Sequence, residues 1–175
     1  VVVGYDGPEP VEDGVTFAEN ALIKARAAAA HTGLPALADD SGICVDVLGG
    51  SPGVFSAYWA GQKKDDKANL ALLLDQLHDV GEEHRAATFV STIALVVPGV
   101  DGESAIEHVV EGRWPGRLAR AASGDGGFGY DPIFVPDGQV PGHETSVAEW
   151  EPARKNAASH RARAFAVLMP LLTGL

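Results

Sequence analysis

The chain has 175 residues, of which 46% are hydrophobic, 21% charged and 7% aromatic, a composition that suits one globular domain and argues against disorder. Its formal net charge of −11 disfavours binding to a nucleic-acid backbone, because such a surface repels phosphates unless it carries a local basic patch. The single cysteine, Cys44, excludes an intramolecular disulfide and a cysteine-built zinc site, and it fits a reducing cytoplasm.

The first predicted element is a helix over residues 17–31, where apolar residues recur at helical spacing behind the capping-box pattern Thr16-Phe17-Ala18-Glu19. A short apolar stretch at 34–38 follows and ends in Asp39-Asp40-Ser41-Gly42. A β-rich run then occupies residues 43–48. This order predicts a strand, a polar turn and a second strand.

A second helix is predicted behind Asp65 or Asp66 as its cap, because leucines then repeat on one face. Residues 86–97 are rich in Val, Thr, Ile and Phe, and residues 104–114 alternate polar and apolar side chains. We expect these two segments to be antiparallel central strands.

The C-terminal part begins with a glycine-dense segment at 121–131, followed by the apolar residues 132–135 and a polar loop at 136–143. A final helix is predicted behind Ser159 as N-cap, with Pro170 bending or ending its last turn. Helices mixed with paired strands predict one α/β domain around a mixed sheet. No apolar run approaches the roughly 18 residues of a membrane span, so we expect no membrane partner.

The adjacent carboxylates of Asp39 and Asp40 face either water or a cation, because burial cannot relieve their repulsion. A solvated turn is the commoner fate of such a pair. Mg²⁺ is the alternative, since it takes one or two carboxylates and completes its shell with water and substrate phosphates. Glu12 and Asp13 form a second acidic pair, which also suits the start of a helix.

The segment from Gly124 to Asp131 contains a glycine pattern of the dinucleotide type, but a β-like run follows it instead of a helix, which excludes a Rossmann motif. Its glycines let the backbone pass close to a planar ligand, with Phe128 or Tyr130 covering the face of that ligand and Asp131 accepting hydrogen bonds. A plain tight turn explains the segment equally well.

Lys155, His160 and Arg161 concentrate donors near the start of the final helix in an otherwise acidic chain. A solvated basic face is the ordinary reading, and an anion or carbonyl-oxygen site is the other. The chain has no Gly-Lys pair of a phosphate-binding P-loop, and His143-Glu144 lacks the second histidine of a zinc protease.

Motifs along the whole chain carry a family resemblance. They are Thr16-Phe17-x-Glu19-Asn20-Ala21, Ala38-Asp39-Asp40-Ser41-Gly42, Pro52-Gly53-Val54-x-Ser56-Ala57, Gly126-Gly127-Phe128-Gly129-Tyr130-Asp131-Pro132 and Ser159-His160-Arg161. In this order they resemble the noncanonical purine nucleoside triphosphate pyrophosphatases, the inosine/xanthosine triphosphatase family.

The resemblance implies a cytoplasmic homodimer that hydrolyses ITP, dITP or XTP to the monophosphate and pyrophosphate with Mg²⁺. It implies an α/β fold with a long, twisted mixed sheet and flanking helices that form two lobes around a central cleft. Asp40 is expected to accept the proton of the attacking water, and Glu12 and Asp40 to bind the metal. The expected substrate-binding residues are Ser41, Phe128, Gly129, Tyr130, Asp131, Lys155, His160 and Arg161.

Two features depart from the family pattern. Residues 1–175 read as a single pyrophosphatase domain without the first strand and the Ser/Thr-x-Asn-x-x-Lys phosphate loop with which the family opens, and we expect those residues to precede Val1. Tyr58 stands where the family usually has Arg. A Maf-like pyrophosphatase for other nucleotides and a purine-nucleotide binder without catalysis remain the alternatives.

Overall fold

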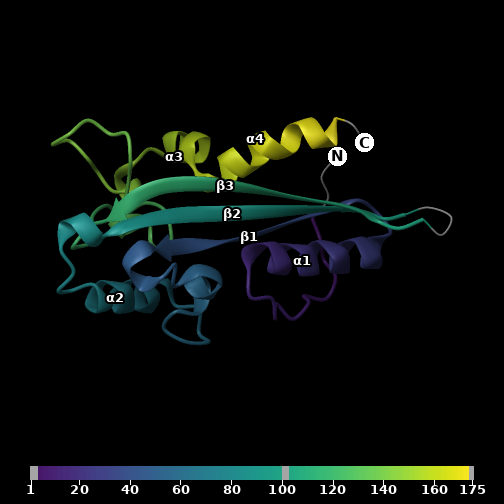
Figure 1. The fold of residues 1–175 in the computed structure, drawn as a ribbon, viewed down its shortest axis with the longest axis horizontal. Coiled ribbons are helices and arrows are strands. Elements are labelled where there is room, and N and C mark those ends of the chain that lie inside the picture. Colours follow the sequence, from purple (N-terminus) through teal and green to yellow (C-terminus); the bar gives the residue numbers. More distant parts are fainter. Residues whose placement is uncertain (1–3, 100–102, 174–175) are drawn as a thin grey trace.

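The computed structural model describes residues 4–99 and 103–173 (Figure 1). Its sheet has the order β1-β2-β3-β4, built from β1 (Ala36–Val45), β2 (Ala86–Val97), β3 (Ile106–Leu118) and β4 (Phe134–Pro136). The predicted α/β class with flanking helices is confirmed. Each strand pair among the described residues is antiparallel, so the parallel pairing of a mixed sheet is not found in this part of the chain.

Two helices cover opposite faces of the long strands: α1 (Phe17–Thr32) lies below them in Figure 1 and α4 (His160–Leu172) above. The α1 face packs alanines of the helix against Ala94 and Val96 of β2. On the other face, Ile93 and Leu95 of the same strand pack against Leu168 of α4. Because successive residues of a strand point to opposite faces, β2 is buried on both sides.

The predicted helix starts are confirmed. Thr16 forms a capping box with Glu19 at the start of α1. Asp65 accepts hydrogen bonds from two backbone amides of α2 (Asp66–Gln76), and the Ser159 hydroxyl accepts from Ala162 at the start of α4. α4 continues two residues beyond Pro170. The short helix α3 (Pro152–Ala158), which directly precedes Ser159, was not predicted.

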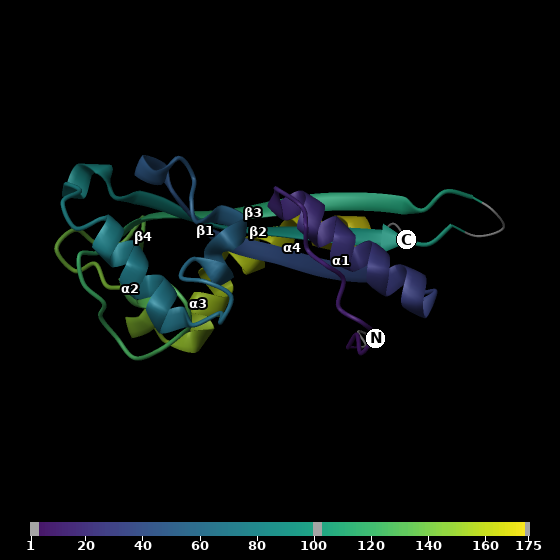
Figure 2. The ribbon, with the colours of Figure 1, turned by 90° about the horizontal axis from the view of Figure 1, so that it is seen from below.

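The end of the molecule that carries α2, away from α1, has its own hydrophobic core (Figure 2). Leu73 of α2 packs there with Ile43, Trp114 and Phe134 from three strands. Short 3-10 helices connect the elements of this end: Asp46–Leu48, Gly53–Tyr58, Glu82–His84, Asp131–Ile133 and Val147–Glu149. The site described below lies between the two ends, along β1.

The prediction of a strand, a turn and a second strand over residues 34–48 is wrong. Residues 36–45 form one continuous strand whose partners run from Val96 down to Ala87 of β2, and Asp39 and Asp40 lie in its middle. The run of polar residues suggested a turn, but the side chains of Asp39 and Asp40 have polar partners on other elements of the chain. The central strands expected at 86–97 and 104–114 correspond to β2 and β3, and β3 extends to Leu118.

No helix in the described ranges is long and apolar enough to cross a bilayer.

Candidate functional site

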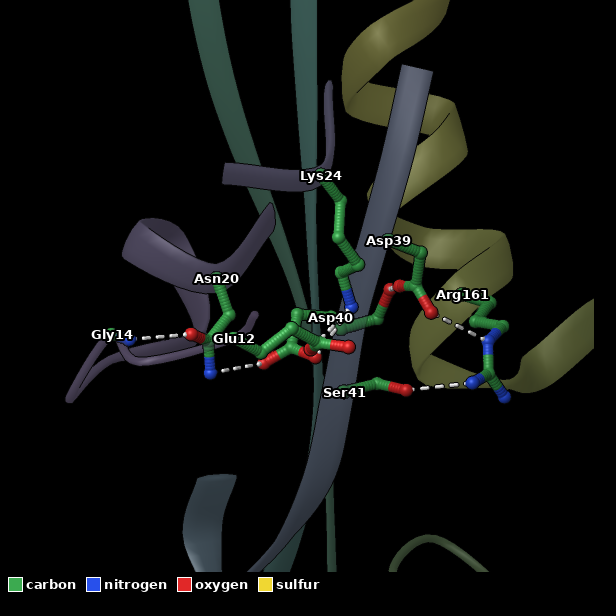
Figure 3. Close-up of polar contacts among 9 residues, drawn as sticks. Glu12, Gly14, Asn20, Lys24, Asp39, Asp40, Ser41 and Arg161 are labelled. Carbon is green, nitrogen blue, oxygen red and sulfur yellow. Dashed lines mark hydrogen bonds and ion pairs between the residues drawn. The ribbon is translucent and has the colours of Figure 1, made fainter. Parts of the chain in front are cut away.

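Asp39 and Asp40 point to opposite faces of β1, which separates their carboxylates (Figure 3). Asp40 faces α1, where Lys24 Nζ lies 2.8 Å from its Oδ1. Asp39 faces α4, where Arg161 Nε donates to its Oδ2 over 3.1 Å. The strand therefore relieves the repulsion that would oppose burial of two adjacent carboxylates in a turn.

The α1 side of β1 brings the predicted metal ligands together. Lys24 Nζ lies 3.0 Å from Glu12 Oε2, so one ammonium group is held between the carboxylates of Glu12 and Asp40. Asn20, one helical turn before Lys24, offers its Nδ2 to Asp40 Oδ2 at 3.5 Å and accepts a 2.9 Å hydrogen bond from the Gly14 amide. Asn20 thereby ties the segment before α1 to the strand.

The carboxylate oxygens of Glu12 and Asp40 fit a hard divalent cation. The structure holds a cation, the Lys24 ammonium, at the place where the oxygens of Glu12 and Asp40 converge. Within residues 4–99 and 103–173 no group of three or more His, Cys, Asp or Glu side chains gathers around one point. Two carboxylates are nevertheless enough for Mg²⁺, which keeps several waters and binds substrate phosphates.

Burial raises the pKa of Asp40 above its ordinary value, although the ion pair with Lys24 acts in the opposite direction. Burial also lowers the pKa of Lys24, but hydrogen bonds with Asp40 and Glu12 outweigh it and raise that pKa overall. Asp40 is therefore a stronger base than an exposed aspartate, and Lys24 stays positively charged.

On the other side of β1, all of the predicted substrate-binding residues line one cavity of about 200 Å³. They come from β1, from the glycine-rich loop and from the last two helices: Ser41, Phe128, Gly129, Tyr130, Asp131, Lys155, His160 and Arg161. Ser56, Asp66 and Phe89 also line it, and sequence reasoning missed them. Asp66 Oδ2 accepts a 3.0 Å hydrogen bond from the Gly129 amide, so the start of α2 holds the loop.

The loop presents one free aromatic ring. Phe128 is 61% exposed, and Lys155 Nζ lies 4.4 Å from its ring centroid. Tyr130 is buried, and its hydroxyl donates to the Ser56 carbonyl over 2.8 Å. Of the two aromatic residues considered from the sequence, Phe128 is therefore the exposed one, and Tyr130 belongs to the packed interior.

Asp131 accepts its hydrogen bonds from the protein. Its buried carboxylate pairs with Lys155 Nζ and accepts a 2.8 Å hydrogen bond from the Phe128 amide. These contacts hold the loop in its turn and place the Lys155 ammonium beside the cavity.

His160 is a buried, neutral donor or acceptor at the cavity. Its ring stacks on Phe89 with centroids 4.9 Å apart, and its Nδ1 has no hydrogen-bond partner among the described residues. Burial and the neighbouring Arg161 lower its pKa to about 4. The imidazole therefore stays neutral beside the cavity, with one buried polar atom unpaired among the described residues.

Gly42 also lines the cavity, and Tyr58 is not among its lining residues. At Gly42 the backbone of β1 comes close to the segment 53–56. A Cβ at this position would lie 2.4 Å from Ser56 Oγ and 2.5 Å from the Gly53 carbonyl oxygen. Tyr58, the departure from the family pattern, lies beneath Lys64, whose Nζ is 4.9 Å from the ring centroid.

Comparison with known proteins gives a consistent result. A sequence model of the Ham1 family matches residues 2–171. A dITP/XTP pyrophosphatase of Leifsonia xyli is 63% identical over 99% of this chain and 83% of its own length. The crystal structure of a nucleoside-triphosphatase, or dITP/XTP pyrophosphatase, from Mycobacterium abscessus is 53% identical, covers 95% of this chain and 81% of its own, and superposes with a TM-score of 0.77.

A HAM1 protein from Coxiella burnetii, at 43% identity, covers 96% of this chain and 82% of its own, with a TM-score of 0.82. Sequence and fold agree over nearly the whole chain, and the chain therefore belongs to the Ham1 family.

Proposed function

We propose that the protein is a Mg²⁺-dependent pyrophosphatase that hydrolyses ITP, dITP and XTP to the monophosphate and pyrophosphate, and so removes deaminated purines from the nucleotide pool. The names of its relatives support this substrate class. The structural observation that carries the proposal is the arrangement of three consecutive residues of β1. Asp40 shares Lys24 with Glu12 on one side of the strand, and Asp39 and Ser41 contact Arg161 on the other.

Asp40 is the residue placed to activate water. Its carboxylate accepts a proton from the water that attacks the α-phosphorus, while the bond between that phosphorus and the bridging oxygen breaks and pyrophosphate leaves. Glu12 and Asp40 would hold Mg²⁺, which would supply positive charge to neutralise the phosphate oxygens.

Arg161 and His160 are placed to read the base. Arginine is a donor only, so Arg161 donates to the 6-oxo group of hypoxanthine or xanthine, whereas the amino group of adenine would place a donor against a donor. A hydrogen-bonding site rejects an analogue by orders of magnitude when the bound analogue covers a donor of the site and leaves it unpaired. Guanine also has a 6-oxo group, so this contact separates ITP from ATP and not from GTP.

The proposal is tested with the full-length protein and a panel of ITP, XTP, GTP, ATP and pyrimidine triphosphates at equal concentration. We expect Mg²⁺-dependent release of pyrophosphate from ITP and XTP, far faster than from ATP. Asp40→Asn is expected to lower turnover at least about 100-fold while ITP still binds, because general base catalysis is worth about 10² to 10⁴. Asp79→Asn, at a fully exposed carboxylate, is the matched control.

Three results would contradict the proposal. Release of orthophosphate would exclude a pyrophosphatase. A preference for pyrimidine nucleotides would favour the Maf-like alternative. Tight ITP binding without turnover, unchanged in Asp40→Asn, would favour a nucleotide binder without catalysis.

The homodimer and the cytoplasmic location remain predictions from the family resemblance. Sedimentation at micromolar concentration tests the first, and localisation of the tagged protein in its own cells tests the second.

A further inference from the structure

The base-reading arginine is held by two residues of β1. Arg161 Nε donates to Asp39 Oδ2 over 3.1 Å, and Arg161 Nη2 donates to Ser41 Oγ over 2.6 Å. A guanidinium group has five N–H donors in a planar fork, so these two bonds fix its plane and leave further donors for a ligand. The same group lies 5.9 Å from the centroid of the Phe128 ring.

Asp39 is itself fixed from the next strand. Its Oδ1 accepts a 2.5 Å hydrogen bond from Ser91 Oγ, and Ser91 is fully buried on β2. Both carboxylate oxygens are thus engaged by protein donors, one from the rigid sheet and one from Arg161. Asp39 connects the buried sheet to a side chain at the cavity.

We propose that Asp39 is a positioning residue for base recognition: it holds the Arg161 guanidinium in the orientation that reads the 6-oxo group of the purine. The inference rests on the proposed function and names a residue that determines its substrate specificity. Asp39 does this through Arg161, on the face of β1 opposite the carboxylates of Glu12 and Asp40. The two neighbouring aspartates therefore have separate tasks.

The direct test is Asp39→Asn, which keeps the size of the side chain but removes the charge that attracts Arg161. Because Arg161 contacts the base and not the reacting phosphorus, we expect KM for ITP to rise about tenfold with kcat within about threefold. The ratio of kcat/KM for ITP to that for ATP is expected to fall about tenfold. The half-saturating Mg²⁺ concentration is expected to stay unchanged.

A double-mutant cycle shows whether Asp39 acts through Arg161. In an Arg161→Met background, Asp39→Asn is expected to change KM and the ITP/ATP ratio less than twofold, because the group it positions is already gone. Ser91→Ala is a second variant that leaves Asp39 in place but frees its Oδ1, and a smaller change in the same direction is expected. Glu82→Gln is the matched control, since it breaks an exposed arginine–carboxylate pair with Arg120 away from the cavity.

The same variants are compared for binding of IMP and AMP by calorimetry, which reads base discrimination without turnover. If the wild-type protein discriminates IMP from AMP but releases no pyrophosphate from ITP, the proposed function is wrong. The positioning role of Asp39 is then decided by the double-mutant cycle measured on IMP and AMP binding. Additive effects of Asp39→Asn and Arg161→Met would overturn the inference. So would a change in Mg²⁺ dependence with unchanged base discrimination, or ITP/ATP ratios in both Asp39→Asn and Ser91→Ala equal to that of wild type.

Discussion

Burial of His160 at the cavity predicts how the free energy of unfolding depends on pH. His160 is 6% exposed and has a pKa of about 4 in the folded protein, against about 6.5 for an unfolded histidine. Since the folded state disfavours the imidazolium form, the unfolded chain binds more protons between these two values. The stability that depends on neutral His160 is therefore complete above pH 6.5 and is lost as the pH falls towards 4.

The size of this loss follows from the two pKa values. Between pH 7.5 and pH 5, proton linkage with a folded-state pKa of about 4 costs about 2 kcal/mol of the free energy of unfolding. For a domain of this size that corresponds to a fall in Tm of about 4–8 °C. His160→Gln cannot take up this proton, so the variant is expected to lose about 2 kcal/mol less than wild type over the same pH interval.

Urea unfolding of both proteins at pH 7.5 and pH 5, in the same buffer and salt, measures the difference. His143→Gln is the control, because it removes an imidazole that is exposed in the folded protein. The comparison between variants cancels the carboxylates that also titrate in this interval. If wild type and His160→Gln lose equal stability between the two pH values, the imidazole is not held neutral in the fold and the reasoning is wrong.

Three further predictions follow from other contacts. Arg85→Ala is expected to lower the free energy of unfolding by about 3 kcal/mol or more in urea titrations, because the fully buried guanidinium donates to the carbonyls of Leu77, Leu118 and Ala119 and the variant removes all three hydrogen bonds; a cost below about 1 kcal/mol would contradict this. Gly42→Ala is expected to cost about 1–3 kcal/mol and to lower activity, since the new Cβ would overlap Ser56 and the Gly53 carbonyl in the 3-10 helix Gly53–Tyr58; unchanged stability would show that this helix moves away freely. Chelation of divalent cations is expected to abolish pyrophosphate release, with activity restored by Mg²⁺, and full activity in excess chelator would refute a metal held by Glu12 and Asp40.

Local signals predicted the elements that depend on local chemistry. The capping box at Thr16, the Asp65 cap and the Ser159 cap all satisfy backbone amides within a few residues, so their patterns are readable from sequence. The strand at 86–97 was equally readable, because β-branched and aromatic residues favour a strand in a buried segment.

The acidic segment of β1 is where sequence reasoning failed. A polar run normally marks a turn, and nothing near Asp39 and Asp40 in the sequence supplies the cations that allow them to lie in a strand. Lys24 and Arg161 supply them from helices that precede and follow the strand. Motif resemblance identified the residues without revealing this geometry.

The sequence by itself determined the candidate chemistry of this protein: an acidic pair suited to Mg²⁺, a glycine-rich aromatic loop and a late cluster of donors. Only the tertiary structure decided that the loop and the donors share one cavity and that β1 divides Asp39 from Asp40. The physical reason is that the alternation of a strand sends neighbouring side chains to opposite faces, and the helices packed on those faces then choose the partner of each.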